Sequence, residues 1–197
     1  MTLVEVLIAL AIFMVVVIAV GTFEVNVFSY QGSISSSYQT AQSAQIMLKT
    51  MLVELREMSP GANGSYSLIK AATSSVSFFS DPDGDGITEQ MTYSLVGTTL
   101  YKAIINPTGS SPSYVYNPAN QSTTTLVTNV RNASSTPLFQ YFDTNYNGTS
   151  SPLTIPVTTT AVRLIKVSLT LDIDPKRSPL PVTYTIQASL RNLKSNL

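Results

Sequence analysis

The residues best able to do chemistry in this sequence gather in one short acidic segment. It reads Asp81-Pro82-Asp83-Gly84-Asp85-Gly86, and Glu89 follows three residues later. Carboxylates at alternate positions of a glycine-containing turn can converge on a hard cation such as calcium, which takes oxygen ligands at ~2.4 Å. The twelve-residue calcium loop of helix–loop–helix proteins ends in a bidentate glutamate. This chain has Thr92 at that place, so Glu89 would have to substitute.

The acidic segment also has a purely steric interpretation. Asp-Gly turns that join two strands are common because aspartate and glycine tolerate the backbone angles of tight turns. Two hypotheses therefore stay open: a calcium site formed by Asp81, Asp83, Asp85 and Glu89, or a turn that binds no metal. No other cofactor is expected.

A second informative carboxylate, Glu5, stands at the head of a long apolar run. From Val6 to Phe23 the only polar side chain is Thr22. These residues, at ~1.5 Å rise each, form a helix of roughly 27 Å, close to the hydrocarbon thickness of a bilayer. A secretory signal begins with basic residues, and none precedes this run, so a membrane or core helix is the better interpretation.

A carboxylate at the edge of a membrane-spanning helix costs a few kcal/mol unless it reaches the interface or is paired. Glu5 therefore either extends toward the lipid headgroups or pairs with a positive group on another subunit. The nearest such group is the free α-amine of residue 1 on a neighbouring, axially staggered helix.

The composition argues against most enzymatic and nucleic-acid functions. The 197 residues include no histidine, cysteine or tryptophan, and the net charge is zero. Imidazole bases, Ser-His-Asp triads, thiolate nucleophiles and the usual zinc sites are therefore excluded. We expect no enzyme, and the chain offers no basic surface for nucleic acid.

Beyond Phe23 the apolar residues fall on one helical face. They recur at spacings of three and four, which predicts a buried stripe: Phe28, Ala41, Ala44, Met47, Leu48, Met51, Leu52, Leu55 and Met58. The opposite face is expected to carry Gln42, Gln45, Lys49, Glu54 and Arg56. One helix from Thr2 to about Met58, ~85 Å long, would end at Ser59-Pro60-Gly61, with a weak point at 33–37.

From residue 74 onward the apolar period changes to two, which predicts strands. The expected strands are 76–79, 91–95, 100–104, 126–130, 161–171 and 182–190. A proline-rich loop, 172–181, would join the last two as an antiparallel hairpin, and 106–125 reads as a long surface excursion. The aromatic clusters at 114–116 and 139–142 are expected to pack rather than to bind a ligand.

The predicted fold class is therefore α+β: a long N-terminal α-helix followed by a mostly antiparallel β-sheet domain, in the shape of a lollipop. Three regions are expected. Residues 1–25 form a transmembrane or filament-core helix half, 26–60 an amphipathic helix half packed on the globular domain, and 61–197 a β-rich head.

The beginning of the chain resembles a known family. Thr2-Leu3-Val4-Glu5-Val6-Leu7-Ile8-Ala9 is similar to the start of mature type IV pilins and pseudopilins. The resemblance implies that a prepilin peptidase has removed a short basic leader and that Met1 is N-methylated. It also implies that Glu5 neutralises the amine of Met1 on the next subunit. Many pilins carry a proline near position 22, where this chain has Gly21-Thr22.

The C-terminal part is more loosely similar to J-type minor pseudopilins and related minor pilins, through 78–86, 137–143 and 189–193. The resemblance implies a structural subunit of an extracellular filament, resident in the inner membrane before an assembly platform adds it to copies of itself and other pilins. Two alternatives stay open: a minor pseudopilin at the tip of a secretion or DNA-uptake pseudopilus, or a membrane-anchored surface adhesin.

Overall fold

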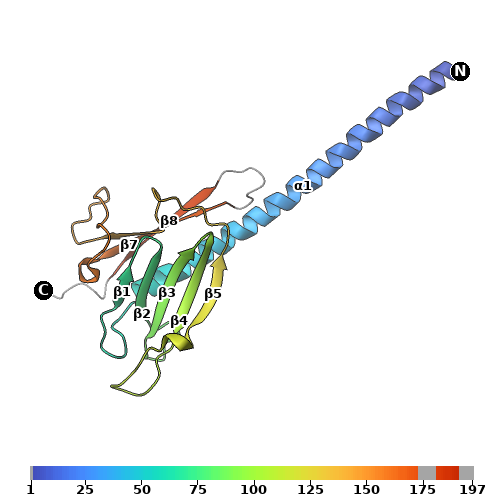
Figure 1. Cartoon of the computed structure of the whole chain (residues 1–197). Helices are drawn as coiled ribbons and strands as arrows, with labels where there is room; N and C mark the ends of the chain where they lie inside the picture. The colour runs from blue at the N-terminus through green and yellow to red at the C-terminus, as the bar shows by residue number, and fades with distance from the viewer. Residues whose placement is uncertain (1, 173–180, 191–197) are drawn as a thin grey trace. The chain divides into compact units, whose positions relative to one another are not determined.

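The computed structural model describes residues 2–172 and 181–190, except for the side chains of Asn26 and of residues 28–40. Within these residues the chain is α+β, because one long helix, α1 (Leu3–Arg56), precedes two sheets (Figure 1). One sheet has five strands and the other three, and every strand pairs with its neighbours in antiparallel fashion. The predicted fold class, with its antiparallel sheets, is confirmed.

The chain forms two compact units, Met1–Gln42 and Ser43–Leu197, and the boundary lies inside α1. The backbone of α1 is helical at Gly21 and throughout 33–37, so the weak point predicted there is not a break. Serine lowers helix stability by only about half a kcal/mol relative to alanine, which is too little to end a long helix. In the first unit, the apolar side chains between Leu3 and Val25 are exposed.

In the second unit, the end of α1 supplies one wall of the hydrophobic core. Ala44, Leu48, Met51 and Leu55 are buried at spacings of four, three and four, and Met58 is buried just beyond the helix. They belong to one cluster with side chains of both sheets, and the half-buried Met47 and Leu52 pack against it, which confirms the predicted stripe from Ala44 onward; Ala41 is half-buried and is not part of the cluster. The side chain of Phe28 lies outside those described.

Glu54 corrects the predicted polar face of the helix. It was expected opposite the stripe, but it is buried, with 6% of its surface exposed. Because it follows Met51 by three residues and precedes Met58 by four, helical geometry brings it to the edge of the buried face. Its carboxylate accepts hydrogen bonds from Lys102 Nζ at 2.6 Å and from the Tyr93 hydroxyl. These contacts offset the desolvation of the charge and tie α1 to the larger sheet.

The five-stranded sheet is a meander of β1 (Leu68–Ala71), β2 (Ser75–Ser80), β3 (Glu89–Val96), β4 (Thr99–Ile105) and β5 (Ser122–Val127). β2, β3 and β4 lie where the sequence predicted strands. β1 was not predicted, since its four residues carry no clear alternation.

The position of β5 corrects the prediction of a strand at 126–130 and shortens the predicted excursion. Its first four residues, Ser122–Thr125, are exposed hydroxyl side chains at the edge of the sheet, so they show no apolar alternation. Asn129 then adopts a positive φ of 60°, and Val130 forms a bridge with Leu171 of the other sheet. The chain therefore changes sheets where the sequence suggested that the strand would continue.

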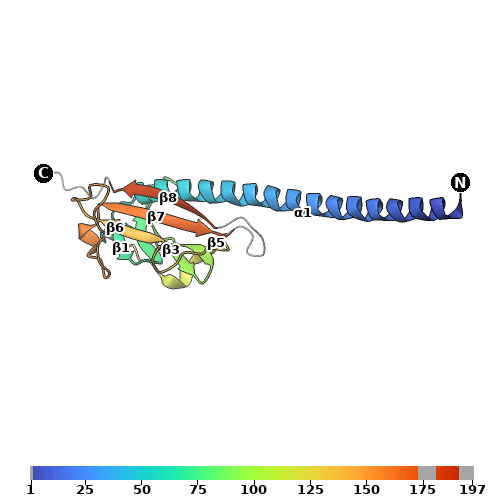
Figure 2. The same ribbon diagram turned by 90° about the horizontal axis from the view of Figure 1, so that it is seen from above.

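The three-stranded sheet consists of β6 (Phe139–Phe142), β7 (Leu164–Leu171) and β8 (Val182–Ser189), with β7 in the centre (Figure 2). β7 alternates between half-buried and buried residues, as a strand with one face in the core should. It begins three residues later than predicted because Thr159–Ala161 forms a short 3₁₀ turn. The β7–β8 hairpin is confirmed, although residues 173–180 of its loop and 191–193 lie outside the described residues.

Candidate functional site

The acidic segment is the turn between β2 and β3. Ser80 pairs with Glu89 at the end of the ladder, so residues 81–88 connect the two strands. Gly84 and Gly86 have φ values of +74° and +85°. Residues with a Cβ rarely adopt such angles, and glycine adopts them at little cost. The two glycines therefore allow the turn to fold back on itself.

Backbone amides converge on the first carboxylate of this turn. Asp81 Oδ1 accepts hydrogen bonds from the amides of Gly84 at 2.7 Å and Asp85 at 3.2 Å, and Oδ2 accepts one from Gly86 at 2.9 Å. Desolvation raises the pKa of Asp81, but the hydrogen bonds, led by those of Gly86 and Gly84, outweigh it and leave the pKa below its ordinary value. Asp81 is thus held ionised and in place.

Three of the four predicted ligands come together. One carboxylate oxygen from each of Asp81, Asp83 and Glu89 lies within 4.8 Å of the other two. Asp85 does not belong to this group; its Oδ1 accepts a hydrogen bond from the Ile87 amide at 2.7 Å. The structure therefore places Asp85 as a turn-forming residue, and the first three as residues that could hold a cation.

Glu89 is the unusual member of the group. It is 6% exposed, and its Oε2 has no hydrogen-bond partner. Burial raises the pKa of Glu89 to about 7, and the charge of Asp83 adds to this effect, followed by those of Asp85 and Asp81. Ser80, its partner across the ladder, is also buried and its hydroxyl oxygen also lacks a partner. Buried polar atoms without partners are uncommon in folded proteins, and each needs an explanation.

Tyr116 holds the end of the same turn that leads into β3. Its hydroxyl donates to the carbonyl oxygen of Thr88 at 2.5 Å and accepts from the Ala62 amide at 2.9 Å. Its ring packs against Phe79, with 4.8 Å between centroids. Tyr116, in the 106–125 excursion, therefore connects the loop that follows α1 to the residue before β3. Its contact with Phe79 agrees with the prediction that the aromatic residues at 114–116 pack.

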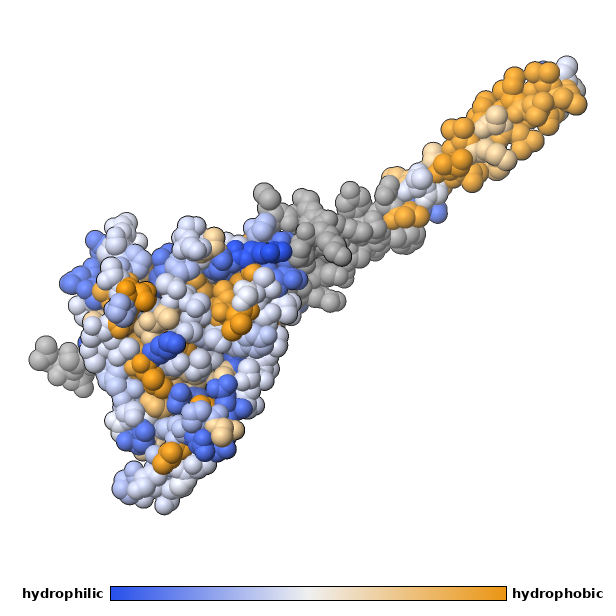
Figure 3. Space-filling model, viewed as in Figure 1, coloured by the Kyte–Doolittle hydropathy of each residue, from blue (hydrophilic) through white to orange (hydrophobic). Residues whose placement is uncertain are grey.

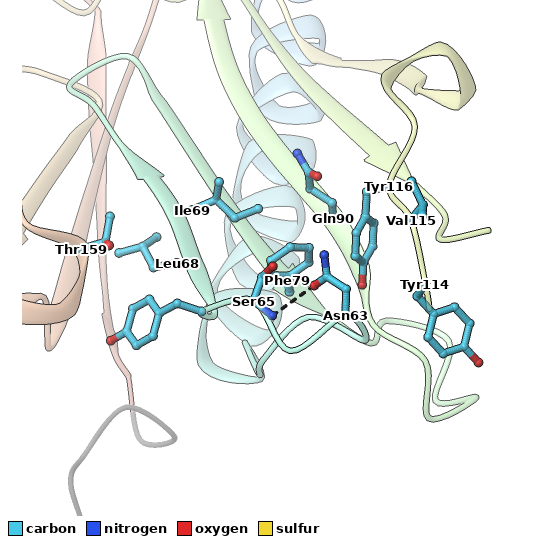
Figure 4. A pocket seen from close by; sticks show the side chains of 11 residues that line it. Asn63, Ser65, Leu68, Ile69, Phe79, Gln90, Tyr114, Val115, Tyr116 and Thr159 are labelled. Atoms are coloured by element: carbon cyan, nitrogen blue, oxygen red, sulfur yellow. Dashed lines mark hydrogen bonds between the residues drawn. The ribbon is translucent and has the colours of Figure 1, made fainter. Parts of the chain in front are cut away.

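A pocket of about 610 Å³ opens beside Tyr116 (Figure 4). Its lining is uncharged and mixes aromatic rings with amide and hydroxyl groups, among them Tyr66, Phe79 and Gln90. Asn63 closes one side through a hydrogen bond from the Ser65 amide, at 3.1 Å. The lining residues include no carboxylate, imidazole, amine or thiol side chain, and their hydroxyl groups come from serine, threonine and tyrosine.

The N-terminal segment forms a second candidate site. The helix from Leu3 to Val25 is long and apolar enough to cross a membrane, and its surface is almost uniformly apolar (Figure 3). Met1, predicted to be N-methylated and to pair with Glu5, lies outside the described residues. Glu5 itself is exposed.

Glu5 has an intramolecular role that the sequence signalled and our prediction missed. The Thr2 amide donates to Glu5 Oε2 at 2.7 Å, and the Glu5 amide approaches Thr2 Oγ1 at 3.4 Å. This reciprocal pair is a capping box, whose signature is Thr-x-x-Glu at the start of a helix. The same four residues that suggest assembly therefore also begin α1.

Comparison with protein-family models finds no match to this chain, and comparison with curated protein sequences finds none either. What the structure itself supports is an apolar N-terminal helix, long enough to span a membrane, followed by an antiparallel β domain.

Proposed function

We propose that this chain is a structural subunit of an extracellular filament of the type IV pilin class. The observation that carries the proposal is an exposed, apolar N-terminal helix, Leu3–Val25, whose first turn carries one carboxylate, Glu5, followed by an uninterrupted apolar run from Val6 to Gly21. A simple membrane anchor needs the apolar residues and can use Glu5 only to cap its helix. A helix that leaves the membrane to join other helices can use both.

The proposed mechanism begins with the helix in the inner membrane, after a prepilin peptidase has exposed and N-methylated Met1. An assembly platform then moves the subunit into a helical filament, in which apolar helices of other copies replace the lipid around Leu3–Val25. Glu5 would pair with the positive amine of Met1 on a neighbouring copy. That pairing offsets the few kcal/mol that a charge costs at membrane depth.

The capping box and the proposed pairing are compatible. A carboxylate can accept about four hydrogen bonds, so one bond to the Thr2 amide leaves capacity for an ammonium group. The two roles differ in what they require. Capping needs an acceptor oxygen at residue 5, whereas pairing needs a negative charge there.

Two matched variants separate these requirements. Glu5→Gln keeps an acceptor oxygen, which a capping box accepts, but removes the charge. Thr2→Ala keeps the charge but removes the cap, at about 1 kcal/mol of helix stability. In the native host, we expect Glu5→Gln to lower the amount of subunit recovered in sheared filaments at least tenfold. Thr2→Ala should retain most of the wild-type amount. Membrane levels of both variants, measured by immunoblot, provide the control.

Normal incorporation of Glu5→Gln, or equal losses in the two variants, would contradict the pairing. Mass spectrometry of the N-terminal peptide gives an independent test, because the proposal requires an N-methylated Met1. A scarce subunit in filaments built from another pilin would indicate a minor, tip-located role. An unprocessed N-terminus with no filament would indicate a membrane-anchored surface domain.

A further inference from the structure

We infer that Asp81, Asp83 and Glu89 form a calcium-binding site that fixes the turn between β2 and β3. The inference concerns only the second compact unit, Ser43–Leu197, and does not depend on the proposed filament.

The first argument is the uncompensated charge of the group. The three carboxylate oxygens lie within 4.8 Å of one another, a separation at which like charges repel. Among the described residues, the ion pairs are Lys102–Glu54 and Arg131–Asp172, so no lysine or arginine there neutralises the group. A divalent cation among the three oxygens would convert this repulsion into attraction.

The second argument is independent of the cluster's charge and concerns the buried end of Glu89. Its unpartnered Oε2 is buried, although leaving a buried acceptor unsatisfied costs about 1–3 kcal/mol and more if it is charged. Ser80 stands directly opposite it in the ladder. Side chains of such a pair share one face of the sheet, with their Cβ atoms about 5 Å apart. Two unpartnered oxygens thus belong to one cross-strand pair, beside the acidic turn.

The third argument is that the ligands are held in place before a cation binds. Three backbone amides fix Asp81, and the sheet register and burial fix Glu89. Asp83 is exposed on the turn, where it can complete the group from the solvent side. A site of this kind avoids part of the ordering cost that a flexible loop meets when it binds an ion.

The chemistry of the group favours calcium among common cations. Carboxylate oxygens are hard ligands, and the chain supplies neither histidine nor cysteine for softer metals. Calcium accepts six to eight oxygens in irregular geometry, and so tolerates three carboxylates completed by carbonyl groups and water. Magnesium demands a nearly ideal octahedron at about 2.0–2.1 Å and retains its water, so it should bind this turn more weakly.

The test uses the full chain, purified in detergent and stripped of metal with EDTA. Calorimetric titration with calcium chloride should show one site, with a dissociation constant of about 10⁻⁴ M or tighter, as extracellular calcium modules have. In scanning calorimetry, about 5 mM calcium should raise the unfolding midpoint of the second unit by roughly 5 °C over the EDTA sample. Magnesium at the same concentration should raise it far less.

Asp83→Asn and Asp85→Asn are a matched pair for this test. Both residues are exposed in the same turn, and both variants keep the Oδ1 that accepts a backbone amide. Asp83→Asn should weaken calcium binding at least about tenfold and abolish the midpoint shift, because it removes a ligand charge. Asp85→Asn should change the affinity no more than about threefold, since it removes only a nearby, solvent-screened charge.

Three results would overturn the inference. The first is an absence of calorimetric binding at millimolar calcium, which would leave a turn that binds no metal. The second is an equal loss in the two variants, which would show a diffuse effect of charge. The third is an equal response to magnesium, which would show a site without preference for calcium. Titration at low temperature, where the protein is folded, gives an answer even if the unfolding transition in detergent is broad.

Discussion

Among single residues, Glu54 shows how a charge can stabilise an otherwise apolar core. It lies between Met51 and Leu55 on α1 and reaches Lys102 on β4 and Tyr93 on β3. Burial raises the pKa of Tyr93, and the charge and hydrogen bond of Glu54 raise it further, so Tyr93 stays protonated and donates. The three groups form a polar connection between the helix and the sheet.

Replacing Glu54 with alanine should destabilise the second unit by about 3 kcal/mol, because it leaves Lys102 and the Tyr93 hydroxyl without their buried acceptor. The free energy of unfolding in urea, followed by circular dichroism of the full chain in detergent, measures the change. Glu57→Ala, at an exposed glutamate just beyond the helix, is the control and should cost less than about 0.5 kcal/mol. A cost for Glu54→Ala as small as that of the control would show that the network contributes little.

Residue-level predictions from the sequence succeeded where spacing decided the outcome. The stripe through Ala44, Leu48, Met51 and Leu55 followed from helical geometry alone. Helical geometry alone did not predict the burial of Glu54. Its residue type suggested a solvated side chain, and its partners Tyr93 and Lys102 lie far along the chain. In the acidic turn, residue types pointed to four carboxylates, but only the folded backbone brings Asp81, Asp83 and Glu89 together and leaves Asp85 outside the group.

At the scale of elements, the two strands β2 and β3 are held together at their acidic end by residues from outside the sheet. Tyr116 belongs to the long connection between β4 and β5, and its hydroxyl bonds to Thr88 and Ala62. This arrangement makes a polar, proline-containing connection part of the structural support of the turn.

Tyr116→Phe should remove these hydrogen bonds while its ring keeps the contact with Phe79. We expect a loss of about 1–3 kcal/mol in the free energy of unfolding, since the Ala62 amide and the Thr88 carbonyl lose a partly buried partner. Tyr114→Phe, on the rim of the same pocket, is the control and should change stability by less than about 0.5 kcal/mol. Equal stability of the two variants would mean that water replaces the Tyr116 hydroxyl without cost.

Elements with strong apolar periodicity were predicted from the sequence, and those defined by their neighbours were not. β2, β3, β4 and β8 alternate clearly enough to be recognised, as does most of β7. β5 is an edge strand of serine and threonine that exists because β4 offers it hydrogen bonds. Its end depends on the positive φ of Asn129, a backbone feature that no apolar pattern records.

At the scale of the whole molecule, the chain combines a segment suited to hydrocarbon with a domain suited to water. Residues 3–25 expose apolar side chains all round the helix, whereas the second unit buries a core of its own. The two units therefore have separable physical requirements. The apolar segment offers a surface suited to a membrane, and the core of the second unit holds the β domain together.

Deleting residues 3–25 should move the protein from the membrane pellet to the soluble fraction, because it removes the only candidate membrane span among the described residues. The unfolding midpoint of the remaining domain should stay within about 3 °C of that of the full chain, since the deleted side chains are not buried in the core. Fractionation of cells and circular dichroism check the two outcomes. A truncated protein that still sediments with membranes, or one that no longer unfolds cooperatively, would contradict this division.

The continuity of α1 also has a mechanical consequence. Its backbone is helical from Leu3 to Arg56, so the apolar segment joins the core without an irregular connector. Tension applied at the N-terminal end is therefore carried along the helix into Ala44, Leu48, Met51 and Leu55, which interlock with the strands. The load therefore reaches the buried face of the second unit through the hydrogen-bonded turns of one helix and not through a loop.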